Sequence, residues 1–192
     1  MSATFAFNAE YEARAQTIIG RYPEGRQQSA VIPLLDLAQR QAGGWLPTEV
    51  LEYVASYLGM PKIRVLEVAS FYSMFNLEPV GKNFVQLCRT TPCWLRGSDD
   101  LRAAAKDVTG CGLGETSDDG LFTVVEVECL GACCNAPMVQ INDDYFEDLT
   151  AESFKAVLEA LKRGETPETG SKVGRKGSEP EGGFTTLTAE GA

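Results

Sequence analysis

Six cysteines are the residues of this chain best suited to chemistry, and four of them form two closely spaced pairs. Cys88 and Cys93 make a C-x4-C pair, and Cys129 and Cys133 make a C-x3-C pair. The chain has no histidine, which excludes Rieske centres, histidine-ligated haem, mixed cysteine–histidine zinc sites and histidine-based catalytic triads. The first residues lack the charged and apolar regions of a secretory signal, so we expect a reducing intracellular setting. There, paired cysteines indicate metal ligands or redox thiols more than disulfides.

The spacing of the two pairs favours an iron–sulfur cluster over zinc. Four thiolates suit either metal centre, but structural zinc sites often use tighter C-x2-C knuckles. A binuclear cluster takes two thiolates on each iron, so the wider pairs fit it better. Plant-type ferredoxins also contain C-x4-C, although their next ligand follows after two residues and here it does not. A zinc site and plain buried or redox thiols remain the alternatives.

The spacing leaves one ligand undecided. Cys134 follows Cys133 directly, so Cys129 and Cys134 also form a C-x4-C pair. Adjacent cysteines point in different directions, and only one of the two is expected to ligate well. Cys111 lies outside both pairs, and we interpret it as a small buried hydrophobic residue.

One glycine of the chain lies in a cysteine loop, and three others form a segment that resembles a dinucleotide-binding motif. Gly131 lies inside the second cysteine loop, where it allows the backbone to approach sulfur closely. Gly110, Gly112 and Gly114 form G-x-G-x-G after a predicted helix, which does not match a dinucleotide-binding fingerprint. With no P-loop and no carboxylate cluster at metal spacing, the chain can carry electrons but shows no place for substrate chemistry. It therefore needs a partner.

The overall composition is that of a globular protein with an acidic surface. The 192 residues are 44% hydrophobic and 23% charged, and the formal net charge is −10. Such a charge argues against nucleic acid or an anionic membrane surface as the partner. No apolar run approaches the roughly 18 residues that a membrane-spanning helix needs.

Residues 1–80 have the hydrophobic periodicity of short amphipathic helices. They predict a small bundle or a helical platform for a partner. Thr48 is expected to be the N-cap of the third helix, and Pro61 to open the fourth. The expected helices are Glu10–Ile19, Ala30–Ala42, Glu49–Leu58 and a segment from Pro61 through Val68.

Residues 81–165 alternate between strand and helix patterns, and two predicted strands end at the cysteine pairs. If both strands end at one edge of a sheet, four thiolates converge there. The order β-α-β-β-β-α suits a small thioredoxin-like α/β domain. The expected strands are Phe84–Leu87, Leu121–Glu128, Met138–Ile141 and Asp144–Asp148, and the expected helices begin at the caps Ser98 and Thr150.

The C-terminal tail, residues 166–192, is rich in Gly, Thr, Glu, Ser and Pro. It has too few aliphatic side chains to offset the entropy of ordering. We expect it to be disordered, or ordered only on a partner.

The cysteine loops and the helical region resemble a known family. The relevant segments are CRTTPCWLRGSDDL, LFTVVEVECLGACCNAPMVQINDDYFEDLT and LPTEVLEYVASYLGMPKIRVLEVASFYSMFN. They are similar to the 24 kDa flavoprotein subunit family of respiratory complex I, which in bacteria is the E subunit of NADH-quinone oxidoreductase. The resemblance extends from about residue 15 to residue 165.

The resemblance implies a fold, a cofactor and a role. Members have a thioredoxin-like domain behind a helical region and bind one [2Fe-2S] cluster. By position, the implied ligands are Cys88, Cys93, Cys129 and Cys133, in preference to Cys134. The implied role is a non-catalytic, electron-carrying subunit of NADH:quinone oxidoreductase.

The resemblance also implies partners and a location. The chain would dock onto the flavoprotein subunit that binds NADH and FMN and exchange electrons with that FMN. It would sit in the peripheral arm without inserting into the membrane, on the cytoplasmic side in bacteria or the matrix side in mitochondria. An equivalent subunit of an NAD-linked hydrogenase or formate dehydrogenase, and a free thioredoxin-like ferredoxin, are the alternative functions.

Overall fold

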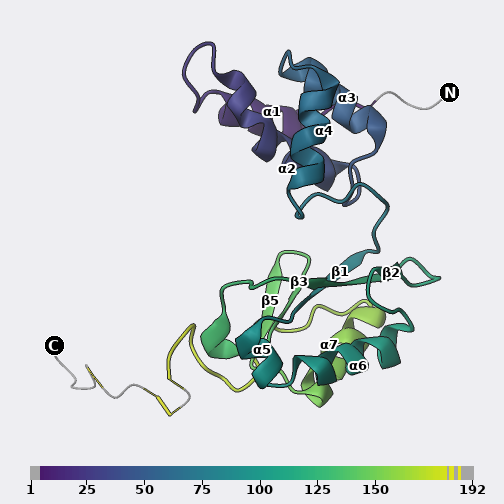
Figure 1. The fold of residues 1–192 in the computed structure, drawn as a ribbon, viewed down its shortest axis with the longest axis vertical. Helices are drawn as coiled ribbons and strands as arrows, with labels where there is room; N and C mark the ends of the chain where they lie inside the picture. Colours follow the sequence, from purple (N-terminus) through teal and green to yellow (C-terminus); the bar gives the residue numbers. More distant parts are fainter. Residues whose placement is uncertain (1–4, 181, 184–185, 187–192) are drawn as a thin grey trace. The chain divides into compact units, whose positions relative to one another are not determined.

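The computed structural model describes residues 5–180, 182, 183 and 186 (Figure 1). The chain divides into two compact units, Met1–Val80 and Gly81–Ala192. No helix among the described residues is both long and apolar enough to cross a membrane.

The first unit is helical, as its sequence periodicity predicts. Its buried side chains lie on the inward faces of the helices and form one hydrophobic core, with Leu34, Val54 and Val65 fully buried. The elements are α1 (Ala9–Ile19), the 3₁₀ helix η1 (Gln27–Ala30), α2 (Val31–Gln41), α3 (Thr48–Tyr57) and α4 (Lys62–Phe71).

Two helices in this unit differ in how their N-termini are capped. The side chain of Asn8 accepts a hydrogen bond from the backbone N–H of Tyr11 and caps α1. The prediction that Thr48 caps α3 is wrong, because Pro47 occupies the N-cap position in extended conformation and no side-chain cap bond forms. Thr48 already has helical backbone geometry and is the first residue of the helix.

The second unit is built on a six-stranded mixed sheet with the order β2-β3-β1-β4-β5-β6. The central strands β1 and β3 run parallel, and β4 pairs antiparallel with β1 on its other side. The strands are β1 (Asn83–Cys88), β2 (Glu115–Thr116), β3 (Phe122–Val127), β4 (Val139–Ile141), β5 (Asp144–Glu147) and β6 (Gly170–Ser171).

Two helices, α6 (Ser98–Thr109) and α7 (Ala151–Lys162), lie side by side on the sheet (Figure 1). Leu101 of α6 and Phe154 of α7 pack with Val85 and Phe122 of the sheet in one core. The Thr150 cap is confirmed, since its hydroxyl and the Ser153 side chain form a reciprocal capping box at the start of α7. The mixed α/β architecture agrees with the predicted fold class.

The structure contains elements that the sequence patterns do not predict. A five-residue helix, α5 (Thr91–Leu95), follows β1, and its early proline, Pro92, needs no N–H partner there. The expected cap Ser98 is the first residue of α6 and is buried; Gly97, with φ of +101°, takes the cap position. A positive φ at that point suits glycine far better than serine.

The described part of the C-terminal tail contacts the rest of the second unit. Gly170–Ser171 pairs in parallel with β5 as the edge strand β6, and Arg175 forms an ion pair with Asp148. Backbone pairing and one buried ion pair hold this segment. Neither interaction requires aliphatic side chains, whose small number is the basis for predicting disorder. Part of the predicted tail, including residues 187–192, lies outside the described residues.

Candidate metal centre

The parallel register of β1 and β3 brings the two cysteine pairs to one edge of the sheet. Cys88 is the last residue of β1 and lies opposite Val127 of β3. Cys129 follows Val127 by two residues. The expectation that both strands end at the same edge, with a cysteine loop after each, is confirmed.

The first pair is held by the turn from β1 into α5. Cys88 and Cys93 are both buried, at 2% and 1% exposure. Each of the two thiols is among the causes that shift the pKa of the other. Because α5 folds back directly after the strand, a C-x4-C spacing is enough to place the two sulfurs side by side.

The second pair lies in an exposed loop that turns tightly at a glycine. The Sγ atoms of Cys129 and Cys133 are 3.3 Å apart. Gly131 has a φ of +87°, a left-handed conformation that favours glycine. Its backbone N–H donates to Cys129 Sγ at 3.4 Å. This confirms the predicted role of Gly131 in bringing backbone close to sulfur.

Polar contacts connect the two loops. The Thr90 hydroxyl lies 3.5 Å from Cys88 Sγ and is also hydrogen-bonded to Cys129. The backbones of Leu130 and Met138 act to lower the pKa values of Cys88 and Cys93, respectively. Groups from outside each pair therefore influence its thiols.

Each pair combines a thiol whose pKa is lowered with one whose pKa is raised. Burial acts to raise the pKa of Cys88, but the donors from Thr90 and Leu130 outweigh it and the pKa is lowered. Burial and then the adjacent Cys88 raise the pKa of Cys93 to about 12. In the second pair, the Gly131 N–H lowers the pKa of Cys129.

The remaining thiol, Cys133, has a raised pKa, as Cys93 has in the first pair. Its hydrogen bond to Cys129, followed by burial, raises its pKa. Metal binding requires thiolates and releases such protons. Loading of this site is therefore expected to be proton-coupled.

The donor set fits a binuclear iron–sulfur cluster. The expectation that all four thiolates converge on one point is not met, because no group of three or more His, Cys, Asp or Glu side chains within the described part of the chain is placed to hold a metal ion. The thiols form two separate pairs, one in each loop, and an all-cysteine [2Fe-2S] centre needs four thiolates, two for each iron. Cys88, Cys93, Cys129 and Cys133 would hold the cluster.

The other two cysteines have different surroundings. Cys134 is exposed, and its backbone carbonyl accepts a hydrogen bond from Arg175. Cys111 is 4% exposed in the core of the second unit, and its Sγ donates to the Thr109 hydroxyl at 3.1 Å. The interpretation of Cys111 as a buried, small hydrophobic residue is confirmed.

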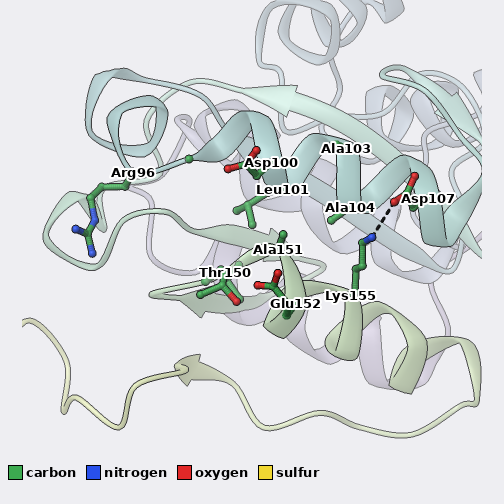
Figure 2. Close-up of a pocket in the computed structure, with 12 residues that line it drawn as sticks. Arg96, Asp100, Leu101, Ala103, Ala104, Asp107, Thr150, Ala151, Glu152 and Lys155 are labelled. Atoms are coloured by element: carbon green, nitrogen blue, oxygen red, sulfur yellow. Dashed lines mark hydrogen bonds and ion pairs between the residues drawn. The ribbon is translucent and has the colours of Figure 1, made fainter.

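A separate cavity of about 480 Å³ lies along α6 and the start of α7 (Figure 2). Its lining is mostly polar, and an ion pair of 2.7 Å between Lys155 and Asp107 crosses it. No cysteine lines the cavity. It is therefore distinct from the candidate metal centre.

Comparison with protein families identifies the domain. The family model of the thioredoxin-like [2Fe-2S] ferredoxin matches residues 15–162. The chain belongs to this family. The match includes all four candidate ligands and also most of the helical unit, so the thioredoxin-like assignment of the fold class is confirmed.

Relatives of this family member are named as parts of larger enzymes. The E subunit of NADH-quinone oxidoreductase from Rickettsia bellii is 55% identical over 158 residues, covering 82% of this chain and 95% of the relative. The mitochondrial NADH dehydrogenase [ubiquinone] flavoprotein 2 of Dictyostelium discoideum is 48% identical over 183 residues, covering 95% of this chain and 74% of the relative.

A solved structure shares the fold. A crystal structure of an NAD+-reducing [NiFe]-hydrogenase matches with a TM-score of 0.62 at 20% identity, covering 72% of this chain and 23% of the hydrogenase chain. At that identity the match supports the fold alone.

Proposed function

We propose that this chain carries one [2Fe-2S] cluster on Cys88, Cys93, Cys129 and Cys133. We further propose that it is the electron-carrying E subunit of NADH:quinone oxidoreductase, respiratory complex I. The observation that carries the proposal is the pairing of thiols at the carboxyl ends of the parallel strands β1 and β3. The assignment to this particular enzyme rests on a relative of that name, which is 55% identical to this chain.

The cluster, when bound, would accept and release single electrons. The chain's own residues provide the ligands and the electrostatic surroundings. The Thr90 hydroxyl contacts the Cys88 sulfur, and the Gly131 N–H donates to the Cys129 sulfur. Because hydrogen bonds to sulfur favour the more negative, reduced state, these donors are expected to raise the reduction potential.

The partner that we propose is the flavoprotein subunit that binds NADH and FMN. The chain would exchange electrons with that FMN and would itself bind neither cofactor, which makes it a non-catalytic subunit. The proposed location is the peripheral arm, on the cytoplasmic side in bacteria. The names of the relatives support membership of the complex, while the flavin partner and the side of the membrane rest on the family resemblance.

The decisive experiment is analysis of the purified chain for iron, acid-labile sulfide and zinc, together with EPR spectroscopy after reduction. We expect two irons and two sulfides per chain and a rhombic signal from the reduced cluster. A colourless protein with one zinc and no EPR signal would contradict the cluster proposal.

A second candidate is the equivalent subunit of an NAD-linked hydrogenase, because a hydrogenase chain shares the fold. Isolation of the chain with its native partners distinguishes the two. Co-purification with quinone-module subunits supports the respiratory role, and co-purification with a nickel–iron subunit supports the hydrogenase. A chain recovered without any stable partner would instead indicate a free ferredoxin.

A further inference from the structure

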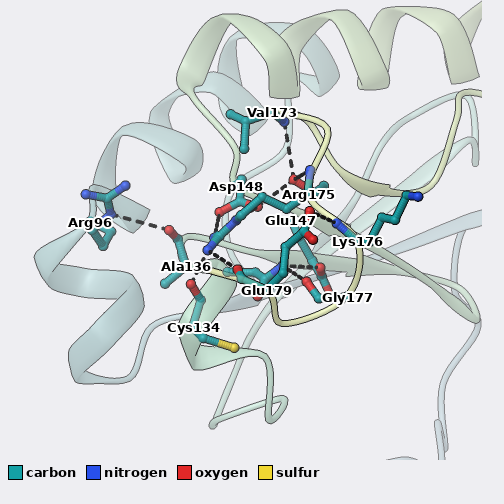
Figure 3. A network of polar contacts seen from close by, with 12 residues as sticks. Arg96, Cys134, Ala136, Glu147, Asp148, Val173, Arg175, Lys176, Gly177 and Glu179 are labelled. Carbon is teal, nitrogen blue, oxygen red and sulfur yellow. Dashed lines mark hydrogen bonds and ion pairs between the residues drawn. The ribbon is translucent and has the colours of Figure 1, made fainter. Parts of the chain in front are cut away.

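The described part of the tail reaches back to the loop that carries the second cysteine pair (Figure 3). Arg175 donates through Nη2 to the backbone carbonyl of Cys134 at 2.9 Å. Through Nε it donates to Asp148 Oδ2 at 3.0 Å, and Nη2 also bonds to Asp148 Oδ1. Its third nitrogen, Nη1, donates to the carbonyl of Glu179. One guanidinium therefore ties the tail, Asp148 and the cysteine loop together.

A second contact joins the tail to the same loop. Asn135 is the last residue of the short 3₁₀ helix η2 (Cys133–Asn135) and is 1% exposed. Its Nδ2 donates to the Gly177 carbonyl at 2.7 Å and to Glu147 Oε2 at 2.9 Å. The backbone N–H of Asp148 donates to the Asn135 carbonyl at 2.8 Å. The turn containing Cys133 is thus held by the tail and by the end of β5.

The ion pair in this network is far more buried than an ordinary surface pair. The side chains of Arg175 and Asp148 are 11% and 6% exposed, and the Ser171 hydroxyl also donates to Asp148 at 2.6 Å. On the other side of the loop, Arg96 at the end of α5 donates to the Ala136 carbonyl at 3.4 Å. A buried charge pair is weak evidence of net stabilisation, because desolvation offsets much of its attraction. Its position beside a ligand loop suggests a positioning role.

We propose that residues 170–179 form a strap that fixes the second cysteine loop, with Arg175 as the positioning residue for Cys133. This inference rests on the proposed function, because positioning matters most when Cys133 is a ligand. Groups that orient metal ligands change metal affinity by about 10–100-fold when they are removed. The strap would slow the release of the cluster and hold its ligand geometry.

The test compares Arg175→Met with Lys176→Met in the full chain. The control removes the same charge one residue away, where the side chain is exposed and the backbone N–H makes the contact with Glu179. For Arg175→Met we expect a shift of the EPR g-values and at least about tenfold faster cluster loss to an iron chelator. In the cluster-free chain, we expect faster hydrogen exchange at the amides of residues 133–136. Lys176→Met should match the wild type in all three measurements.

A double variant separates positioning from simple destabilisation. Arg175→Met alone leaves the Asp148 carboxylate buried without its charge partner, whereas Arg175→Met combined with Asp148→Asn removes both charges. We expect the double variant to keep the altered g-values and the faster cluster loss. A wild-type spectrum and release rate in the double variant, or equal behaviour of Arg175→Met and Lys176→Met, would overturn the proposal.

Failure of the proposed function gives a different result. If the wild-type chain holds no iron or sulfide, the cluster assignment fails. The hydrogen-exchange comparison on the cluster-free chain still reports directly whether the strap holds the loop.

Discussion

Cys88, the last residue of β1, lies directly opposite Val127 in the parallel strand β3. This register decides where the second cysteine loop begins, because Cys129 follows Val127 by two residues. A shift of one residue between the strands would also move every side chain of β3 to the opposite face of the sheet. The buried residues Phe122 and Val124 in the core of the second unit oppose such a shift. Core packing and the metal centre therefore depend on the same register.

Serine substitutions test which adjacent cysteine is the ligand. Cys133→Ser is expected to abolish or distort the EPR signal, because the Cys133 Sγ lies 3.3 Å from Cys129 Sγ in the second pair. Cys134→Ser is the matched control and should leave the spectrum nearly unchanged. EPR and iron content of both variants provide the measurement, and the reverse pattern would reassign the ligand to Cys134.

Removal of the Thr90 hydroxyl tests whether this group raises the reduction potential of the proposed cluster. Thr90→Val deletes a donor to Cys88 and Cys129, so the reduced state loses stabilisation and the midpoint potential should fall. The free energy of unfolding should change by only about 1 kcal/mol, the net value of one hydrogen bond. A redox titration monitored by EPR measures the potential, with Thr91→Val as the control. An unchanged or higher potential in Thr90→Val would contradict the tuning role.

A truncation in the helical unit tests its core. Leu34 is fully buried, so Leu34→Ala should lower the free energy of unfolding by about 2–5 kcal/mol. Ile63 is 58% exposed, and Ile63→Ala should change it by no more than about 0.5 kcal/mol. Chemical denaturation followed by circular dichroism measures both. Equal effects of the two variants would contradict the packing of Leu34 in this core.

Tyr57 makes the helical unit sensitive to alkaline pH. Burial, with the hydrogen bond that its hydroxyl donates to Glu12, raises the pKa of Tyr57 from 10.0 to about 12. The folded state then retains a proton that the unfolded state loses. The resulting stability is complete below pH 10 and declines as the pH rises through about 12. Tyr57→Phe should flatten this decline in urea denaturation series that span both pKa values, while Tyr22→Phe should not.

One outcome would contradict the prediction that Tyr57 makes stability depend on alkaline pH. If wild type and Tyr57→Phe lose stability in parallel as the pH rises from 10 to 12, the contact between Tyr57 and Glu12 contributes nothing to the helical unit. The distance between the Tyr57 hydroxyl and Glu12 Oε1, 2.7 Å, makes that outcome unexpected.

Hydrophobic periodicity is enough to predict most helices and the central strands. The helical spacing of Leu34 and Leu37 identifies α2, and the alternation from Phe122 to Val127 identifies β3. The predictions of two helix N-caps are wrong, because a residue with a good capping side chain lies one position inside the helix. Thr48 and Ser98 are good capping residues, yet Pro47 and Gly97 occupy the cap positions. Cap identity depends on where the helical backbone begins, and periodicity locates that point only to within a few residues.

Residue types and their spacing alone restrict the kind of centre that this chain can form. The absence of histidine and the C-x4-C and C-x3-C spacings leave thiolates as the ligands, because spacing and residue type are local properties. The folded chain adds that Cys88 and Cys129 lie at one sheet edge, that Thr90 contacts both, and that Arg175 reaches the Cys134 carbonyl. These relationships join residues far apart in the chain. They depend on strand register and on tail packing, which no local pattern encodes.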